Sequence, residues 1–161
     1  MSNSILVSMQ DDVPEPSWLS HVEPFVQSAM QAAGFDGEEV SILFCNDAFI
    51  QQLNHQYRDI DNATDVLSFE NGESYEDEHG TVWKSVGDIV ISLETLPKNA
   101  AYFTCTEDEE LKRLLLHGLL HLNGMDHGEE HIEPGVAPAG EMLSLQEKLL
   151  SQLQDKTIMN G

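Results

Sequence analysis

The sequence predicts a single α+β domain in which helices cover a small mixed β-sheet of about four strands. Strand and helix patterns alternate along the first half of the chain. The loop between residues 69 and 82 is too short for a helical crossover, so the strands on either side of it should pair antiparallel. A length of 161 residues with 40% hydrophobic content suits one core, and we treat residues 1–161 as one domain.

Apolar spacing predicts the first strand and the first helix. Residues 4–9 form a short run rich in apolar and β-branched side chains, which is typical of a strand. Apolar positions between residues 18 and 33 recur at helical spacing, with Ser17 as candidate N-cap and Gly34 as the stop. Pro24 lies inside this pattern, so the helix either kinks there or begins there.

The next segment predicts a strand, a helix and a further strand. Residues 40–45 alternate as a strand does, and Asn46 is placed to cap a helix that Arg58 follows. Residues 65–69 predict the third strand. The acidic segment 70–81 holds little that could build a core, so we expect a solvated, mobile loop there.

The fourth strand precedes a helix with a clear start signal. Residues 86–93 contain a continuous apolar run, which predicts a strand buried on both faces. A short helix is expected within residues 94–103. Thr106 and Glu109 form a capping box at the start of a leucine-rich helix that runs to Leu122.

The C-terminal segment predicts one more helix. Residues 133–140 hold two prolines and two glycines and are expected to form a loop. Apolar positions from 142 to 153 follow the spacing of an amphipathic helix. The tail, residues 156–161, is expected to be frayed.

Composition restricts the partners and the compartment. Asp and Glu number 29 against 7 Lys and Arg, and the net charge of −22 opposes tight electrostatic binding of nucleic acid. Cys45 and Cys105 lack metal or redox spacing, which favours reduced thiols in a cytoplasmic protein over a single disulfide. No apolar run is long enough to cross a bilayer, and the N-terminus lacks the positive segment of a signal peptide, so we expect no membrane partner.

Three histidines near the end of the leucine-rich helix predict a metal site. His117 and His121 lie four residues apart, which places both imidazoles on one face of the helix. Gly124 can take the positive φ of a sharp turn, which would bring His127 back as a third ligand. Three histidines without a cysteine fit a catalytic zinc site with an open fourth position, although imidazole also suits nickel, copper and iron.

The residue between the first two histidines disfavours a peptidase. The spacing His-x-x-x-His-x-x-Gly-x-x-His is that of metzincin peptidases, but Gly118 replaces their general-base glutamate. Without that carboxylate, a peptidase would lose the group that takes the proton from its attacking water. His131 either competes with His127 as a ligand or is an exposed polar residue, and we favour the second because it lies outside the leucine-rich helix.

Four stretches carry a resemblance to a known family. They are Leu53-Asn54 with Tyr57-Arg58, residues 64–69, residues 87–92, and His-Gly-Leu-Leu-His-Leu-Asn-Gly-Met-Asp-His at residues 117–127. In this order they resemble the signatures of the YbeY family of rRNA-maturation endoribonucleases. Three positions differ from the family's usual glycine, proline and tyrosine, namely Asp59, Glu70 and Met125.

The resemblance implies a metal-dependent, single-strand-specific endoribonuclease that acts on small-subunit (16S) rRNA, particularly at its 3′ end, and in ribosome quality control. By position it assigns one Zn²⁺ to His117, His121 and His127, and catalytic roles to Arg58 and His117. An arginine opposed to a cation can stabilise the charge that builds on phosphate oxygens during phosphodiester cleavage. The nucleophile stays open between a water on the metal and the 2′-hydroxyl of the substrate.

Asp65 and Asp88 are candidate orienting groups, with an equal case for each as a simple strand-end or turn carboxylate. The expected partners are single-stranded rRNA, the ribosome or its small subunit, and a ribosome-associated protein. Cations are few, and Lys112 and Arg113, one turn before His117, could give a local patch for RNA. We expect weak RNA binding by the protein alone, with the substrate delivered by docking to the ribosome or to that protein.

Two other functions remain open on the sequence alone. The first is a ribosome-assembly factor in which the metal is structural and nuclease activity is marginal. The missing general base and the acidic surface both favour it. The second is a metallopeptidase-like hydrolase, which Gly118 disfavours.

Overall fold

The computed structural model describes residues 3–62, 64–125 and 138–159, and within them the chain forms one four-stranded sheet. The strand order is β1-β2-β4-β3. β2 pairs parallel with β1 and with β4, and β3 pairs antiparallel with β4 at the edge. The predicted mixed sheet and its antiparallel third and fourth strands are therefore confirmed. The strands are β1 (Ser4–Met9), β2 (Glu38–Cys45), β3 (Val66–Glu76) and β4 (Val82–Ser92).

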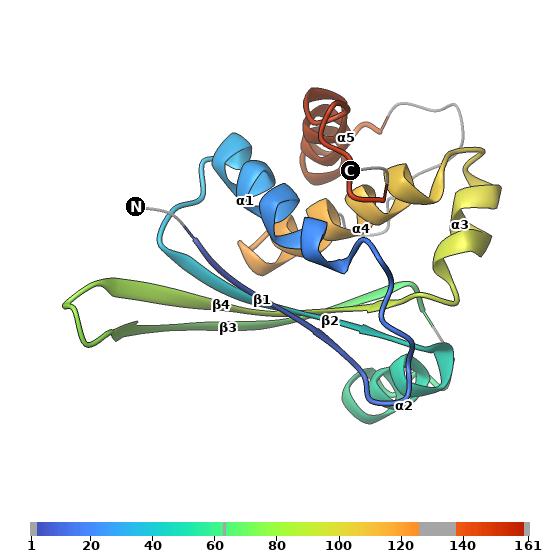
Figure 1. The fold of residues 1–161 in the computed structure, drawn as a ribbon, viewed down its shortest axis with the longest axis horizontal. Helices are drawn as coiled ribbons and strands as arrows, with labels where there is room; N and C mark the ends of the chain where they lie inside the picture. The colour runs from blue at the N-terminus through green and yellow to red at the C-terminus, as the bar shows by residue number, and fades with distance from the viewer. Residues whose placement is uncertain (1–2, 63, 126–137, 160–161) are drawn as a thin grey trace.

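Helices cover the two faces of the sheet unequally (Figure 1). α1 and α4 lie against one face, α2 lies against the opposite face, and α5 lies outside α4. None of the helices in the described part of the chain is long and apolar enough to cross a membrane. The helices are a 3-10 turn (Leu19–His21), α1 (Val22–Ala33), α2 (Asp47–Arg58), α3 (Leu96–Tyr102), α4 (Glu107–Leu122) and α5 (Glu141–Gln152).

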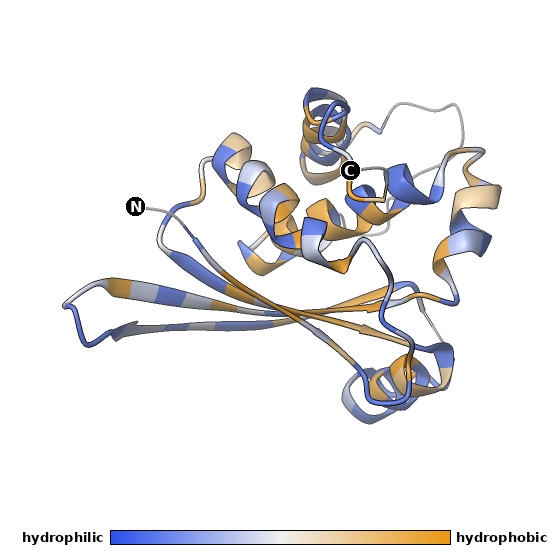
Figure 2. Ribbon diagram, viewed as in Figure 1, coloured by the Kyte–Doolittle hydropathy of each residue, from blue (hydrophilic) through white to orange (hydrophobic). Residues whose placement is uncertain are grey.

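Strand alternation divides the core between the two faces. On β4, Ile89 and Ile91 belong to the main core under α1 and α4, whereas Val90 packs with Leu67 and Ile50 on the α2 side. Hydrophobic residues fill the middle of the sheet and the helix faces turned toward it (Figure 2). This arrangement follows from the period of two in a strand, which turns successive side chains to opposite faces.

Several predicted helix boundaries are confirmed by their capping groups. The Asn46 side chain accepts a hydrogen bond from Phe49 N at the start of α2, and Gly34 ends α1 with a φ of 83°. Pro24 lies in the first turn of α1, so it marks the start of the helix and not a kink. The prediction of Ser17 as N-cap is wrong, because the 3-10 turn precedes α1 and His21 occupies its N-cap position.

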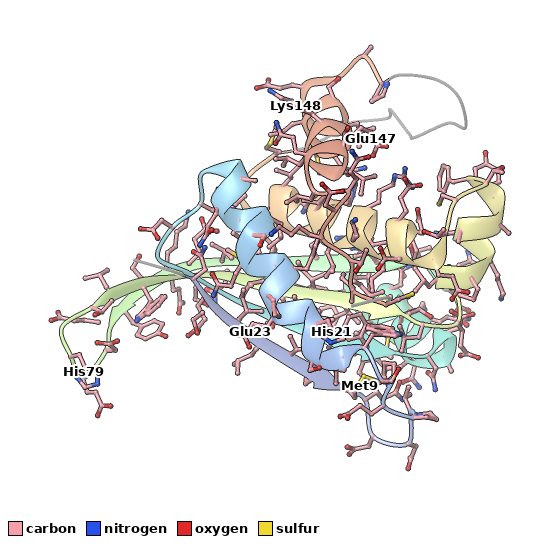
Figure 3. All side chains as sticks on the ribbon, turned by 45° about the horizontal axis from the view of Figure 1, so that its top comes forward. Met9, His21, Glu23, His79, Glu147 and Lys148 are labelled. Atoms are coloured by element: carbon pink, nitrogen blue, oxygen red, sulfur yellow. The ribbon has the colours of Figure 1, made fainter. Side chains whose placement is uncertain are left out.

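The predicted loop over residues 70–81 is wrong for residues 70–76, and residues 77–81 form the turn. β3 continues to Glu76, and its ladder with β4 pairs Tyr75 with Trp83 and Glu76 with Val82. A two-stranded ribbon exposed on both faces needs backbone pairing and no core, so acidic side chains do not prevent it. The ribbon projects beyond the helices, with His79 at its tip (Figures 1 and 3).

An acidic residue closes the turn of this ribbon. Asp77 Oδ1 accepts hydrogen bonds from the backbone N–H groups of His79 and Thr81, each at 2.9 Å. Its second oxygen accepts from Trp83 Nε1, also at 2.9 Å, and this bond lowers the pKa of Asp77. The carboxylate therefore organises the turn through local hydrogen bonds, as Asp commonly does.

The prediction of a frayed tail is wrong for its described residues. Ile158 is fully buried, and its backbone N–H donates to Asp108 Oδ1 at 2.8 Å. The Ile158 carbonyl oxygen lies 2.9 Å from His21 Nδ1, which ties the tail to the entry of α1. The predicted loop 133–140 lies outside the described residues up to residue 137, and α5 begins directly after Gly140.

Candidate functional site

The two described histidines of the predicted metal site share one face of α4. The ring centroids of His117 and His121 lie 6.5 Å apart, with an angle of 19° between the ring planes. His127 and His131 lie outside the described residues. Within the described residues, no group of three or more His, Cys, Asp or Glu side chains gathers as a metal site would. The three-histidine site thus stays a prediction.

Gly118 lies on the face of α4 that touches the sheet. A Cβ at this position would lie 2.8 Å from Ile89 Cδ1 and 3.0 Å from two further atoms of the same side chain. Helix and strand are therefore in contact at this point, and a glutamate here would be forced into the core. The absence of a general base between the histidines has a packing cause.

A glutamine from α5 holds the His117 ring. The Oε1 atom of Gln146 lies 2.8 Å from His117 Nδ1, and the Gln146 side chain is 1% exposed. Gln146 Nε2 donates to Glu147 Oε2 at 3.1 Å. This bond assigns the amide orientation, so Oε1 faces the imidazole and Nδ1 must carry the proton. The lone pair of a neutral His117 ring is then on Nε2.

An arginine of α4 fixes Glu147 in turn. Arg113 Nε lies 3.1 Å from Glu147 Oε2, and Arg113 Nη2 lies 3.1 Å from Glu147 Oε1. On its other side, Arg113 Nη1 donates to Glu110 Oε1 at 2.8 Å. Burial alone would lower the pKa of Arg113, but these two carboxylates raise it overall. Burial also raises the pKa of Glu110, to about 6, although Arg113 opposes this shift.

His121 faces a different element. Its Nδ1 atom is buried and has no hydrogen-bond partner among the described residues, while Glu70 Oε1 of β3 lies 3.8 Å away. The turn that follows is held by Asn123, whose Nδ2 donates to Glu38 Oε1 at 3.1 Å. Glu38 is a buried carboxyl whose pKa is raised by that burial. Gly124 has a φ of 88°, in agreement with the predicted sharp turn.

The predicted catalytic arginine is attached to the strand that faces His121. Arg58 is the last residue of α2, and its Nη2 donates to the Ser68 carbonyl oxygen at 3.2 Å. Ser68 and Glu70 are two residues apart on β3, which corresponds to a spacing of about 7 Å along a strand. The structure therefore brings Arg58 and His121 to the same edge strand from opposite faces of the sheet.

The two predicted orienting carboxylates occupy different places. Asp65 accepts hydrogen bonds from Val66 N and Asn99 Nδ2, so it joins the start of β3 to α3. Asp88 lies on the α2 side of β4 and lines a cavity of about 500 Å³ with Tyr57. The structure does not bring Asp88 together with the histidines, because the sheet lies between them.

The predicted basic patch at Lys112 and Arg113 is wrong. Lys112 is 3% exposed, and its Nζ donates to the Leu153 carbonyl oxygen at 3.0 Å. Arg113 is held between Glu110 and Glu147, as described above. Both cations serve the packing of α4 against the C-terminal part of the chain, and neither presents its charge to solvent.

No sequence pattern marks Gln146 or Glu147 as site residues, and Glu70 stands out only as a departure from the family's usual residue. Gln146 and Glu147 lie in an amphipathic helix pattern, in which single polar residues are common. Apart from that departure, Glu70 lies in an acidic segment, where one more carboxylate does not stand out. A distance of 29 residues separates Gln146 from the histidine that it contacts. Only the packing of α5 on α4 makes them neighbours.

Comparison with known proteins identifies relatives over most of the chain. Residues 6–154 match the family model described as Endoribonuclease YbeY. A protein named Endoribonuclease YbeY from Treponema denticola is 49% identical over 158 residues, which is 98% of each chain. Its namesake from Treponema pallidum is 45% identical over 150 residues, covering 93% of this chain and 89% of its own. The solution structure of TM1509 from Thermotoga maritima is similar with a TM-score of 0.60 and 26% identity, covering 94% of this chain and 89% of that one.

Proposed function

This chain belongs to the YbeY endoribonuclease family, and we propose that it is a zinc-dependent, single-strand-specific enzyme that matures the 3′ end of small-subunit (16S) rRNA and takes part in ribosome quality control. Hydrolytic endoribonuclease activity follows from the family and from relatives up to 49% identical over 98% of the chain. The metal, the rRNA site and a cytoplasmic location are our proposals. The two free cysteines support the last of these.

The observation that carries the proposal is the setting of the two histidines on α4. The contact of His117 Nδ1 with Gln146 Oε1 at 2.8 Å leaves the lone pair of this ring on Nε2, the form in which imidazole binds a metal. The buried Nδ1 of His121, without a hydrogen-bond partner in the described part of the chain, fits a ring whose orientation a bound ion completes. His117, His121 and His127 would hold the ion. When bound, zinc would act as a Lewis acid toward the phosphodiester.

Arg58 supplies the second positive charge. Its guanidinium is exposed and makes one hydrogen bond among the described residues, to the Ser68 carbonyl oxygen. A guanidinium has five N–H donors in a planar fork that matches the oxygens of a phosphate. We assign Arg58 to binding the non-bridging phosphate oxygens, where negative charge grows during cleavage.

The protein surface supplies little further attraction for RNA. The net charge is −22, and Lys112 and Arg113 are engaged inside the protein. We therefore propose that single-stranded rRNA reaches the site while the protein is docked on the small ribosomal subunit or on a ribosome-associated protein. Affinity for free RNA should fall only slightly with salt, since few phosphates are neutralised. A steep salt dependence, which requires many phosphate contacts, contradicts this part of the proposal.

The test combines metal analysis with one substitution. Purified protein should contain close to one zinc ion per chain, and it should cleave a single-stranded precursor of the rRNA 3′ end in preference to a duplex. Arg58→Ala should lower cleavage by about 10²-fold or more with metal content and folding unchanged, because an electrostatic contact to the transition state is lost. The matched control is Lys148→Ala, which removes an exposed cation of α5 (Figure 3) and should leave cleavage as it is.

The end groups of the cleavage products identify the nucleophile. A 2′,3′-cyclic phosphate end shows attack by the 2′-hydroxyl of the substrate, whereas a plain phosphate end without that intermediate shows attack by water. Unchanged cleavage in Arg58→Ala contradicts the proposed role of this residue.

A second candidate function is a ribosome-assembly factor whose metal is structural. The observation that favours it is the absence of a carboxylate at position 118, where Gly118 packs on Ile89. It predicts normal docking to the small subunit with cleavage at the background level, both in the unmodified protein and in Arg58→Ala.

A further inference from the structure

We propose that Gln146, oriented by Glu147 and Arg113, is a positioning residue that fixes the Nδ1–H tautomer of His117 and so keeps the lone pair of the ring on Nε2, the nitrogen that would bind the metal. The metal part of this inference rests on the proposed function. The tautomer part stands on the contacts of Gln146 alone.

The orientation of the Gln146 amide is decided by its two neighbours. Its Oε1 lies 2.8 Å from His117 Nδ1, and its Nε2 donates to Glu147 Oε2 at 3.1 Å. Rotation of the amide by half a turn would set a carbonyl oxygen against the carboxylate of Glu147. The flipped amide could still donate to His117 Nδ1, but the hydrogen bond to Glu147 would be replaced by repulsion between two acceptors, in a side chain that is 1% exposed. The amide therefore presents an acceptor to His117.

Glu147 is itself held in place by Arg113. The guanidinium contacts both carboxylate oxygens, with Nε to Oε2 at 3.1 Å and Nη2 to Oε1 at 3.1 Å. Such a two-point contact fixes the plane of the carboxylate as well as its position. Arg113 side-chain exposure is 12%, so solvent competes little for this pair.

These contacts form a chain, here called the relay, that begins at Arg113 on α4, passes through two residues of α5 and ends at His117 on α4. Arg113 of α4 orients Glu147 of α5, Glu147 orients Gln146, and Gln146 contacts His117, which lies one helical turn after Arg113. The relay places a largely enclosed arginine and a buried amide beside the histidine.

The contact with Gln146 decides which of the two nitrogens of the neutral His117 imidazole carries the proton. A ring with its proton on Nδ1 has its lone pair on Nε2, and the acceptor at Nδ1 decides which form dominates. Acceptors of this kind orient metal-binding histidines, and their loss typically weakens metal affinity by about 10- to 100-fold. If Gln146 served only to satisfy its own buried amide, replacing it would leave the tautomer of His117 unchanged.

The test reads the tautomer directly by ¹⁵N NMR of the His117 ring in metal-free protein, at a pH where imidazole is neutral. Gln146→Leu removes the acceptor and should shift His117 toward a mixture of tautomers. Gln146→Glu keeps an acceptor at this place and should retain the Nδ1–H form. Glu147→Ala, at a more exposed position, releases the amide and should shift the ring partway. Gln152→Leu, at the exposed end of the same helix, is the control and should change nothing.

Zinc affinity, measured by competition with a chromophoric chelator, gives the second readout. The dissociation constant should rise about 10- to 100-fold in Gln146→Leu and stay within a few-fold in Gln146→Glu. An unchanged His117 tautomer in both Gln146→Leu and Glu147→Ala overturns the proposal. If the unmodified protein binds no zinc while Gln146→Leu still shifts the tautomer, the metal part of the proposed function fails and the positioning role of Gln146 stands.

Discussion

The carboxylate of Glu70 lies beside the ring of His121, with Oε1 of the first 3.8 Å from Nδ1 of the second. The two side chains come from β3 and α4, so this contact joins the edge of the sheet to the histidine helix. His117 is approached from α5 instead, through Gln146. The two described histidines are therefore approached from different elements, His117 at hydrogen-bond distance from α5 and His121 at 3.8 Å from β3.

Removing the charge of Glu70 should weaken metal binding modestly. Glu70→Gln leaves an acceptor near His121 and removes a negative charge close to the predicted cation. Because the Glu70 side chain is 56% exposed, solvent screens its charge. We expect zinc affinity to fall by about two- to fivefold. The control is Glu73→Gln, an exposed carboxylate further along β3. Equal losses in both variants would show a general charge effect and not a contact with His121.

A side chain at position 118 should destabilise the fold. In Gly118→Ala the new Cβ meets Ile89 Cδ1 at 2.8 Å, so the Ile89 side chain or the helix must shift. We expect a loss of about 1–3 kcal/mol in the free energy of unfolding, measured in urea. Combining it with Ile89→Val removes one of the crowded atoms and should recover part of that loss. A double variant that loses the sum of the two single effects would show that the two residues do not share the strain.

Gly118 illustrates what could be predicted from the sequence and what could not. Periods of two and of 3.6 identify the strands and helices that bury one face, and the short connection before β4 predicts its antiparallel pairing. The mixed sheet and the shared face of His117 and His121 were therefore predictable. The need for a glycine at position 118 could not be predicted, because it depends on how closely α4 approaches Ile89.

The two wrong predictions of disorder have a common cause. Residues 70–76 and the described part of the tail are short segments held by hydrogen bonds to distant partners, which composition does not report, and in the tail the burial of Ile158 adds to them. Asp77 organises the turn of the first segment and Asp108 holds the second. The Arg113 relay to Gln146 escaped prediction for a similar reason, because its partners meet only once α5 packs on α4.

Ile158 should contribute to stability as a core residue does. It is fully buried next to Asp108, which accepts hydrogen bonds from the backbone of Ile158 and Met159. We expect Ile158→Ala to cost about 2–5 kcal/mol in the free energy of unfolding, as for other buried aliphatic truncations. The exposed Lys156 of the same tail serves as control, and Lys156→Ala should be neutral. If Ile158→Ala leaves the free energy of unfolding unchanged, the tail is frayed in solution, as the sequence predicted.

Glu110 should make stability depend on pH in a defined window. Burial raises its pKa from 4.5 to about 6 in the folded protein, so the folded state binds the proton more tightly than the unfolded state does. The resulting stabilisation is complete below pH 4.5 and is lost as the pH rises through about 6. The shift corresponds to about 2 kcal/mol at most.

Glu110→Gln removes this titration, so the stability difference between the unmodified protein and the variant should change between pH 4.5 and pH 6 and level off above it. Urea unfolding at several pH values measures the difference, and Glu109→Gln, one residue earlier and more exposed, controls for the loss of a carboxylate on α4. A difference that stays constant across the window would mean that Arg113 holds Glu110 ionised throughout, with the ion pair at 2.8 Å outweighing burial.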